Sequence, residues 1–375
     1  MIYLDYSANT PVDARVLEQF CAVERRCIGN ANSHHQAGSA AKAEIDAATI
    51  KIASLLGVQP AEIIYTSGAS EANNFALKGL ARLSRHAGRH IISTPLEHSS
   101  VSGTLTALQE QGYEIDLLDV KQDGTVDLEH LKDLLRPDTI CVAVTLVDSE
   151  LGVVQPVQEI AAILKAYPHC HLHVDATQAV GKIPVSFEGV DTMSLTAHKF
   201  YGLNGIGLLI KRRNLALEPL IHGGESTTIY RSGTPTVALA SSLACALDLA
   251  VIDLPNRVDH VAKLNAELRA ALSTYPLVRI NSPDHAIPHV LNLSVRNIKG
   301  TVFQRELDAK GVCVSVKSAC SSDGLPSRAV FAVSRDRRNA LSSWRISLSH
   351  LTTEDEIKAF LQAFDVCYRE LTAVH

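Results

Sequence analysis

Short apolar segments alternate with amphipathic helical segments between Glu62 and Ile210, and this alternation constrains the fold of the 375-residue chain more than any other feature. Parallel strands need crossover connections, so a repeated strand–helix order predicts a mainly parallel sheet with helices on both faces. The predicted strands are 63–66, 90–93, 114–118, 139–146, 171–174, 192–195 and 207–210, and the predicted helices are 70–83, 99–111, 128–135 and 157–167. The sequence therefore predicts an α/β fold built on a seven-stranded sheet.

A second, smaller unit is expected after the sheet. A helical stretch over 236–275, interrupted at Pro255, leads away from it. Shorter elements follow: strands at 290–295, 312–315 and 344–348, a helix at 301–310, and a final helix opened by a capping box of Thr353 and Glu356. We predict a large domain at 15–255 and a smaller α+β domain formed by 1–14 together with 256–375.

Composition excludes several classes of protein. The net charge of −5 gives no global basic field for nucleic acid or anionic lipid, and we interpret the local cluster Arg335, Arg337 and Arg338 as an exposed turn. Eight cysteines without a CxxC pair argue against a zinc site and a disulfide framework, and they favour a reducing cytoplasm. The longest apolar runs, such as 140–147, are too short to span a bilayer, and the strand-like start at residues 1–5 leaves no room for a cleavable signal.

Two strands of the predicted sheet end at residues that suggest a cofactor. Asp175 follows the strand 171–174, and Lys199 lies between the strand 192–195 and a glycine-rich run. Ligands of such sheets bind beyond the carboxyl ends of the strands, so one crevice can hold both residues. A lysine that forms a Schiff base and an aspartate that pairs with a pyridinium nitrogen are what pyridoxal phosphate (PLP) requires. Either residue alone would indicate only a solvated loop charge.

Three separate segments offer ligands for a phosphate group. Residues 65–74 form a strand, a Gly/Ser turn and a helix start, where backbone amides and the Ser70 hydroxyl suit an anion. In isolation Ser70 could equally be an ordinary helix cap. Thr196 and His198 flank Lys199, and the segment 231–234 adds a further hydroxyl and a cation. Together the three segments favour the phosphate site.

Three further residues are candidates for chemistry. His98 follows the strand 90–93, so it enters the same crevice and could stack on a ring and move protons; the alternative is a helix cap. Cys320 lies in a run of small polar residues and is predicted to be an accessible thiol. Arg345 alternates with apolar neighbours in a strand, which suits either an α-carboxylate ligand or a structural salt bridge.

Taken together, these segments resemble the class V aminotransferase family of PLP fold type I, and within it the cysteine desulfurases of the NifS/IscS type. The resemblance extends over nearly the whole chain and is carried by residues 3–11, 29–38, 66–71, 173–178, 231–234, 318–322 and 352–356. So many motifs in the same order make the resemblance specific. It implies a soluble homodimer that binds PLP, acts on L-cysteine and passes sulfur to an acceptor protein.

The resemblance also implies a role for each matched residue. Lys199 would carry PLP, Asp175 would pair with its ring nitrogen and Gln178 would bond its phenolic oxygen. His98 would stack on the ring and act as acid or base. The phosphate ligands would be Ala69, Ser70, Thr196 and His198, with Thr234 from the other subunit. Arg345 would bind the cysteine carboxylate, and Cys320 would take the sulfur as a persulfide while alanine is released.

Departures from the family pattern keep other interpretations open. Ser149 replaces an asparagine that bonds the PLP phenolic oxygen, and the segment 223–231 lacks one glycine of the family motif. The alternatives are another enzyme of the family, such as a selenocysteine lyase or an aminotransferase, or a weakly catalytic scaffold that binds partners. The sequence does not separate iron–sulfur assembly, tRNA thiolation and DNA phosphorothioation as destinations of the sulfur.

Overall fold

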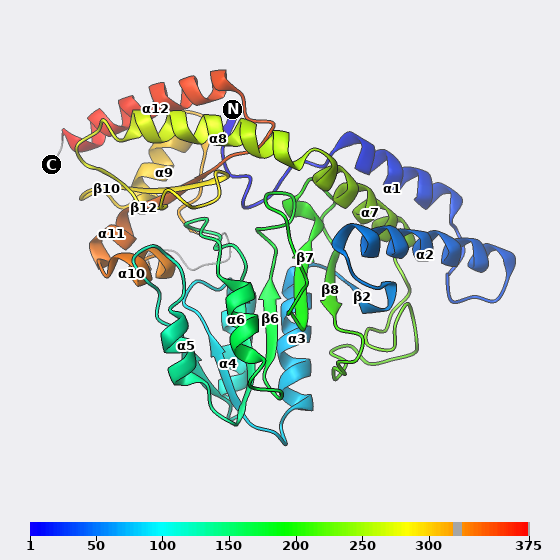
Figure 1. The fold of residues 1–375 in the computed structure, drawn as a ribbon. Helices are drawn as coiled ribbons and strands as arrows, with labels where there is room; N and C mark the ends of the chain where they lie inside the picture. The colour runs from blue at the N-terminus through cyan, green and yellow to red at the C-terminus, as the bar shows by residue number, and fades with distance from the viewer. Residues whose placement is uncertain (318–324, 374–375) are drawn as a thin grey trace.

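A seven-stranded mixed sheet forms the centre of the molecule (Figure 1). The computed structural model describes residues 1–317 and 325–373. The strand order is β2-β8-β7-β6-β5-β3-β4, in which β8 runs antiparallel to both neighbours and all other neighbours are parallel. The strands are β2 (Ile63–Thr66), β3 (His90–Ser93), β4 (Glu114–Leu117), β5 (Thr139–Thr145), β6 (His171–Asp175), β7 (Thr192–Thr196) and β8 (Gly207–Lys211). The predicted fold class is confirmed, and each strand lies within one residue of its prediction.

Helices cover both faces of this sheet. Successive residues of a strand point to opposite faces, so Val142 and Val144 of β5 join one core while Cys141 and Ala143 join the other. The first core includes α2, α6 and α7, and the second includes α3 and α4. These helices and α5 are α2 (Gln36–Leu56), α3 (Ala69–Leu83), α4 (Ser99–Gln109), α5 (Leu128–Leu134), α6 (Val157–Leu164) and α7 (Val237–Ile252). Three predicted helices ran one to three residues too far, because the amphipathic pattern continues past the last helical hydrogen bond.

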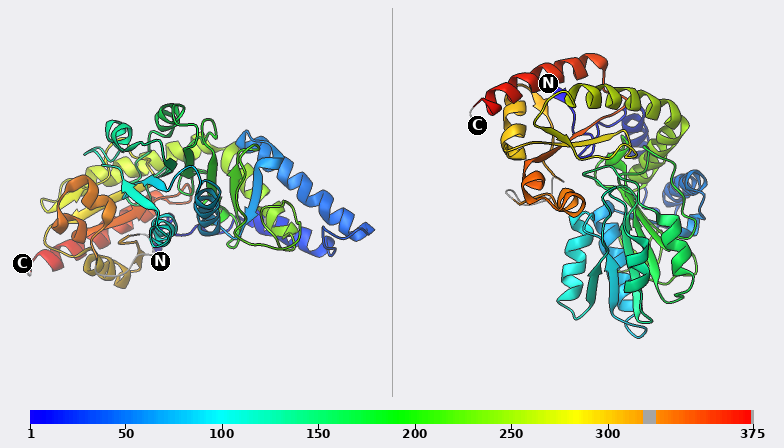
Figure 2. Two further views of the ribbon diagram at one scale, coloured as in Figure 1. Left: turned by 90° about the horizontal axis from the view of Figure 1, so that it is seen from below. Right: turned by 60° about the vertical axis from the view of Figure 1, so that its left-hand side comes forward.

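A separate core, outside the large sheet, forms around a three-stranded antiparallel sheet of order β12-β10-β9. Aromatic side chains fill it: Trp344 stacks on Phe303 at 5.2 Å between ring centroids, and Phe364 packs against both. Helices α8 and α12 lie side by side over this sheet (Figure 2, right). The elements are β9 (Val278–Ile280), β10 (Val290–Val295), β12 (Ser343–Ser347), α8 (Leu254–Leu272), α9 (Gly300–Ala309) and α12 (Glu354–Thr372). The predicted capping box of Thr353 and Glu356 opens α12.

The N-terminal segment joins the core of the three-stranded sheet. Strand β1 (Ile2–Tyr3) pairs in parallel with β11 (Val312–Cys313), and Leu4 is fully buried among the residues of the core. Ile287 and Val290, however, pack in a core of the large sheet. The domain boundaries at 15–255 and 256–375 therefore stay a prediction.

The long helical stretch after the sheet is two helices. Helices α7 and α8 meet at Asp253 with a bend of 66°. The break lies two residues before Pro255 and not at it, because proline is tolerated in the first turn of a helix. Within residues 1–317 and 325–373, no single helix has the length and apolar character to cross a membrane; the bent pair α7 and α8 meets that test only when taken together.

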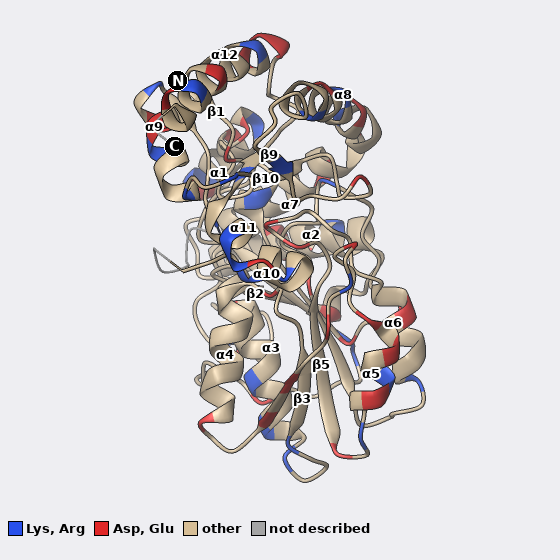
Figure 3. Ribbon diagram, turned by 90° about the vertical axis from the view of Figure 1, so that its left-hand side faces the viewer, with Lys and Arg blue, Asp and Glu red and all other residues tan. Residues whose placement is uncertain are grey.

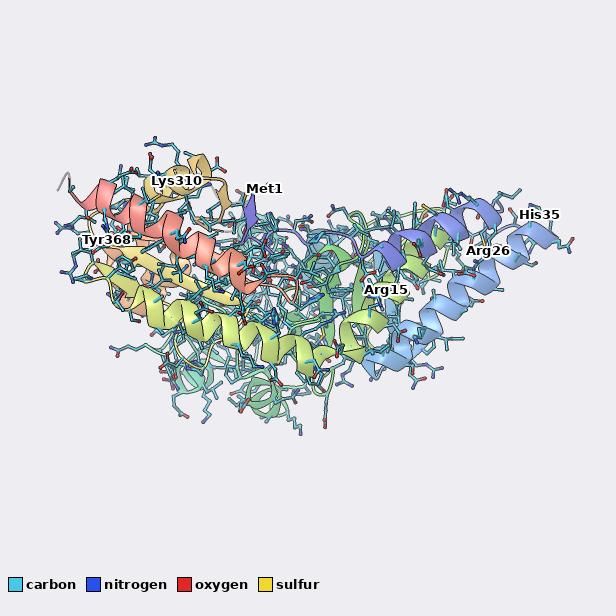
Figure 4. All side chains as sticks on the ribbon, turned by 90° about the horizontal axis from the view of Figure 1, so that it is seen from above. Met1, Arg15, Arg26, His35, Lys310 and Tyr368 are labelled. Carbon is cyan, nitrogen blue, oxygen red and sulfur yellow. The ribbon has the colours of Figure 1, made fainter. Side chains whose placement is uncertain are left out.

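Several elements were not predicted. Helix α1 (Ala14–Arg26) and α2 pack on α7 and extend away from the sheet, so that Arg26 and His35 lie at the opposite end of the molecule from Lys310 and Tyr368 (Figure 4). Strand β9 and helices α10 (Arg328–Ser334) and α11 (Arg337–Ser342) were also missed. The interpretation of the arginine cluster as an exposed turn holds for Arg335, which has φ of +52°, but is wrong for the two arginines that begin α11.

The backbone is closely packed where β8 starts. Gly207 pairs with Thr66 of β2 on one side and with Thr196 of β7 on the other. A Cβ atom at Gly207 would lie 2.5 Å from the backbone oxygen of Leu195 and 2.7 Å from the Cα of Gly68, the residue before α3. Glycine at this position therefore allows the turn that starts α3 to lie directly against the sheet.

We predict that Gly207→Ala lowers the free energy of unfolding by about 1–3 kcal/mol, because backbone atoms cannot move aside as a side chain can. The matched control is Gly103→Ala in α4, where a Cβ atom meets nothing within 4 Å. There the same substitution should stabilise the protein by about 0.5–1 kcal/mol. Urea denaturation of both variants measures the two effects, and equal signs would contradict the close packing at Gly207.

Candidate active site

A cavity of about 320 Å³ lies at the carboxyl edge of the large sheet. Its walls come from the carboxyl ends of β2, β3, β5, β6 and β7 and the segments that follow them, from the N-terminal residues Ser7 and Ala8, and from β12. The predicted site residues that line it are Ala69, Ser70, His98, Ser149, Asp175, Gln178, Thr196, His198, Lys199 and Arg345. The structure thus brings together residues that are up to 276 positions apart in the chain.

Two predicted site residues remain to be placed. Thr234 is exposed on the segment before α7 and does not line the cavity of its own chain. Cys320, the predicted nucleophile, lies outside the described residues.

One end of the cavity has the donors that suit a phosphate. Gly68 adopts φ of +152°, which favours glycine, and directs the chain from β2 into α3. The amides of Ala69 and Ser70 lie in the first turn, where a helix offers no internal acceptor. Thr196 Oγ1 lies 3.1 Å from His198 Nδ1, so both side chains reach the same region.

An acidic residue at this end is neutralised by an ion pair. Glu71 lines the cavity, and its carboxylate lies 3.0 Å from Arg231 Nε and accepts a hydrogen bond from the Ser67 amide. Burial alone would raise the pKa of Glu71, but the bonds to Arg231 and Ser67 lower it below its usual value. The pair leaves the helix dipole and the amides of α3 available to an anion.

Lys199 ends a short 3₁₀ turn, Ala197–Lys199, directly after β7. Its Nζ atom donates to the backbone oxygens of Ser7 at 2.7 Å and Ala8 at 2.6 Å, so the N-terminal segment holds the amine in the cavity. Burial, together with the charges of Lys199 and Lys182, lowers the pKa of His198 to about 4. His198 is therefore neutral near pH 7.

Asp175 has a fixed orientation. Its Oδ1 accepts from the Thr177 amide at 2.9 Å, and its Oδ2 accepts from Asn73 Nδ2 at 2.8 Å. Asn73 is fully buried in α3, and its Nδ2 also donates to Ser100 Oγ while its Oδ1 accepts from Ser194 Oγ and His173 Nε2. Both carboxylate oxygens are thus held before any ligand binds.

His98 is both a helix cap and a residue of the cavity lining. It is the N-cap of α4, because its Nδ1 accepts from the Ser100 amide at 3.1 Å, and it also lines the cavity. An Nδ1 that accepts this bond leaves the proton of the neutral ring on Nε2. Burial lowers the pKa of His98, and the nearby charge of Lys199 adds to this effect.

Gln178 is oriented by a buried lysine. Lys182 is 5% exposed, and its Nζ donates to Gln178 Oε1 at 2.7 Å. The amide nitrogen of Gln178 consequently faces the other way and donates to the Ser7 oxygen at 2.9 Å. Burial, with added repulsion from Lys199 and Arg345, lowers the pKa of Lys182 to about 7.

Arg345 extends from β12 of the three-stranded sheet into the cavity at the large sheet. Its Nη2 pairs with Asp5 at 2.9 Å and its Nη1 donates to the Ser149 backbone oxygen at 2.7 Å. Its Nε is buried without a hydrogen-bond partner among the described residues. The salt bridge that the sequence left as an alternative is present, and the guanidinium keeps an unused donor for a carboxylate as well.

Sequence reasoning missed Asn73 and Lys182. Asn73 follows Glu71 and Ala72 in the helix start that was predicted, and a polar residue one turn into a buried helix is the signal that could have found it. Lys182 lies four residues after Gln178 but outside any predicted helix. No pattern in the sequence indicates that this lysine is buried.

The buried Lys182 gives a testable pH dependence of stability. Its folded pKa of about 7 lies below that of an unfolded lysine, about 10.4. Between these values the unfolded chain binds the extra proton, so the free energy of unfolding rises with pH by up to about 1.4 kcal/mol per unit. Lys182→Met removes this titration, and its stability relative to the wild type should therefore fall with that slope from about pH 7 to pH 9.5.

Urea denaturation over this pH range measures the slope. Lys165→Met, a change of an exposed lysine, is the matched control and should follow the wild type at every pH. Parallel curves for Lys182→Met and the wild type would show that Lys182 keeps an ordinary pKa in the folded protein.

Comparison with known proteins agrees with this geometry. The protein-family profile described as "Aminotransferase class-V" matches residues 2–360. The protein named "Cysteine desulfurase IscS" from Proteus mirabilis is 39% identical over 95% of this chain and 90% of its own length. Among solved structures, one titled "NIFS-LIKE PROTEIN" has a TM-score of 0.92 and 36% identity, covering 99% of both chains.

A further solved structure is titled "SspA in complex with cysteine". It has a TM-score of 0.83 and 30% identity, and the match covers 94% of this chain and 100% of that chain. The resemblance found in the sequence motifs is thereby confirmed over the whole length. This chain belongs to the class V aminotransferase family.

Proposed function

We propose that this chain is a PLP-dependent cysteine desulfurase, which moves the sulfur atom of L-cysteine onto Cys320 and releases L-alanine. The observation that carries the proposal is the meeting of Lys199, Asp175 and Arg345 in one cavity. A relative named cysteine desulfurase and a structural neighbour solved with cysteine support the substrate.

The cavity fits PLP by size and by its donors. Its volume of about 320 Å³ lies in the range of about 300–1,000 Å³ that small-ligand sites occupy. Thr177 Oγ1 and Ser7 Oγ are buried in its lining without a partner among the described residues, so each can still bond a ligand or a water. We propose that Lys199 forms the covalent bond to PLP, that Asp175 pairs with the ring nitrogen of PLP and that Gln178 donates a hydrogen bond to its phenolic oxygen.

The phosphate ligands and the neighbouring residues complete this assignment. The phosphate is assigned to Ala69, Ser70, Thr196 and His198. We propose that the imidazole of His98 stacks on the face of the PLP ring. Ser149 lies in the same lining, and its side chain replaces an amide of the family pattern with a shorter hydroxyl.

PLP, when bound, supplies an electron sink that stabilises negative charge at the substrate Cα. Asn73 and the Thr177 amide keep the Asp175 carboxylate in one orientation. His98 is neutral near pH 7 with its proton on Nε2, so it donates at that atom. Arg345 binds the substrate carboxylate through donors that Asp5 and Ser149 leave unused.

The sulfur transfer itself is assigned to Cys320 on the basis of the family pattern. The thiolate of Cys320 attacks the substrate sulfur, a sulfur–sulfur bond forms and the bond between sulfur and Cβ breaks. The electron pair of the broken bond stays with the carbon, which takes up a proton to become the methyl group of alanine. The persulfide on Cys320 then passes to an acceptor protein.

The site is proposed to work in a homodimer. Thr234 is exposed and lies outside the lining of its own cavity, which suits a residue that reaches the phosphate in the partner subunit. The altered segment 223–231 adjoins Thr234 and would shape the same contact.

We predict that the protein saturated with PLP shows an absorbance band of the bound cofactor and that Lys199→Ala abolishes it, because this variant lacks the amine that forms the covalent bond. Lys165→Ala, which changes a lysine outside the cavity, is the control and should keep the band. A band that survives in Lys199→Ala would assign the cofactor to another group and would also weaken the desulfurase proposal.

We predict that Cys320→Ala lowers the rate of alanine formation from L-cysteine by about two orders of magnitude or more while the cofactor band is kept. Cys21→Ala, in α1 and outside the cavity, should leave the rate unchanged. Mass spectrometry of the intact protein after mixing with cysteine should find one added sulfur in the wild type and none in Cys320→Ala. Undiminished turnover in Cys320→Ala would instead favour a selenocysteine lyase or an aminotransferase.

A further inference from the structure

A second hollow, of about 590 Å³, lies on the other side of the three-stranded sheet from α8 and α12 and shares no lining residue with the cavity that holds Lys199. Its walls are the start of β9, the loop between β10 and α9, and helix α11. Its lining residues are Pro276, Leu277, Val278, Arg279, Ser294, Arg296, Asn297, Lys299, Asp336, Arg338, Asn339, Leu341 and Ser342. We call this hollow the basic groove.

The basic groove gathers cations that have no counter-ions. Its four exposed cations are Arg279, Arg296, Lys299 and Arg338, and blue segments gather on α11 and beside β9 and β10 in Figure 3. Within residues 1–317 and 325–373, the side chains of these four form no ion pair and no hydrogen bond. Like charges that are held together without partners create a positive potential that attracts an anion.

The lining holds one acidic residue, Asp336, which offsets only one of these four positive charges. Asp336 is the N-cap of α11, and its Oδ1 accepts from the amides of Arg338 at 2.9 Å and Asn339 at 3.1 Å. The lining therefore keeps an excess of positive charge. The groove also suggests a role for Arg338, which belongs to the arginine cluster noted in the sequence and has no part in the proposed function.

The floor of the groove is apolar or already satisfied. Leu277, Val278 and Leu341 are half-buried there. Ser294 Oγ donates to the Asn339 oxygen at 3.1 Å, and Asn339 Nδ2 donates onward to another side chain at 2.9 Å. A ligand of matching chemistry would bring carboxylates for the rim and apolar groups for the floor.

We propose that the basic groove binds an acidic segment of a partner protein, in which carboxylates alternate with apolar side chains. Carboxylates suit the rim because an arginine can bind them through two parallel hydrogen bonds. A nucleic acid fits less well: the groove lining has no aromatic side chain on which a base could stack, and the net charge of −5 repels a long polyanion. This proposal does not depend on the proposed function.

The test uses fluorescence anisotropy to measure how a fluorescently labelled synthetic peptide that repeats Glu-Leu binds the full-length protein. The peptide should bind, and its affinity should fall as salt is raised from about 0.05 M to 0.5 M, because screening acts on exposed charges. The double variant Arg279→Glu with Arg338→Glu should bind at least about tenfold more weakly, since it removes two attractive charges and adds two repulsive ones. The matched control is Lys263→Glu with Arg305→Glu, which changes the net charge equally outside the groove.

The outcomes separate clearly. Weakened peptide binding in the groove variant alone, with a circular dichroism spectrum and a urea denaturation midpoint like those of the wild type, supports the proposal. Three results would overturn it: no binding of the peptide, equal weakening in both double variants, or an oligothymidylate that binds the groove as tightly as the peptide. Failure of the desulfurase assays leaves the peptide result unaffected, so the two proposals can fail separately.

Discussion

Asn73 lies where α3 crosses the carboxyl edge of the large sheet, and its side chain is completely enclosed. Its two donors go to Asp175 and Ser100, and its oxygen accepts from His173 and Ser194, so the amide is fully used. A buried polar group that loses its partner costs about 1–3 kcal/mol. The orientation of Asp175 therefore depends on the same amide that joins α3 to β6 and β7. The first turn of that helix carries the proposed phosphate ligands, so the two ends of the cavity are connected through Asn73.

The N-terminal segment closes the other side of the cavity through backbone atoms. The oxygens of Ser7 and Ala8 accept from Lys199, and the Ser7 oxygen also accepts from Gln178. Asp5 pairs with Arg345 of β12, 340 residues away in the chain. Burying such a pair costs desolvation energy, and breaking it by removing one partner costs more, because a charge is then left alone. The first residues of the chain thus hold a cation from each core at one site.

The sequence predicted the large sheet well because most of its strands are short, buried segments that contain apolar residues and because its ligand edge follows from parallel topology. Asp175 ends β6, Lys199 and His98 follow β7 and β3, and all three line the cavity. Helices α1 and α2 were not predicted, although they pack on α7, and α2 has few long apolar side chains to form a stripe. The hydrogen bond between Lys182 and Gln178 could not be predicted either, because it depends on burial that only the packed structure provides. Patterns locate strand ends, whereas partners of buried polar groups come from tertiary packing.

Ser149 shows how the site accommodates a change in its lining. The contact between position 149 and Arg345 uses the backbone oxygen of Ser149, at 2.7 Å from Nη1. A backbone contact is independent of the side chain, so the replacement of the family's asparagine leaves the position of Arg345 intact. The exchange changes only the side chain at position 149: a serine hydroxyl offers one hydrogen-bond donor, and it reaches less far than the amide of asparagine. Gln178, whose amide nitrogen is oriented by Lys182, faces the same cavity and supplies a fixed donor there. Lys182 orients that donor, so the burial of this lysine and the exchange at Ser149 both act on the part of the cavity where the phenolic oxygen of PLP is proposed to bind.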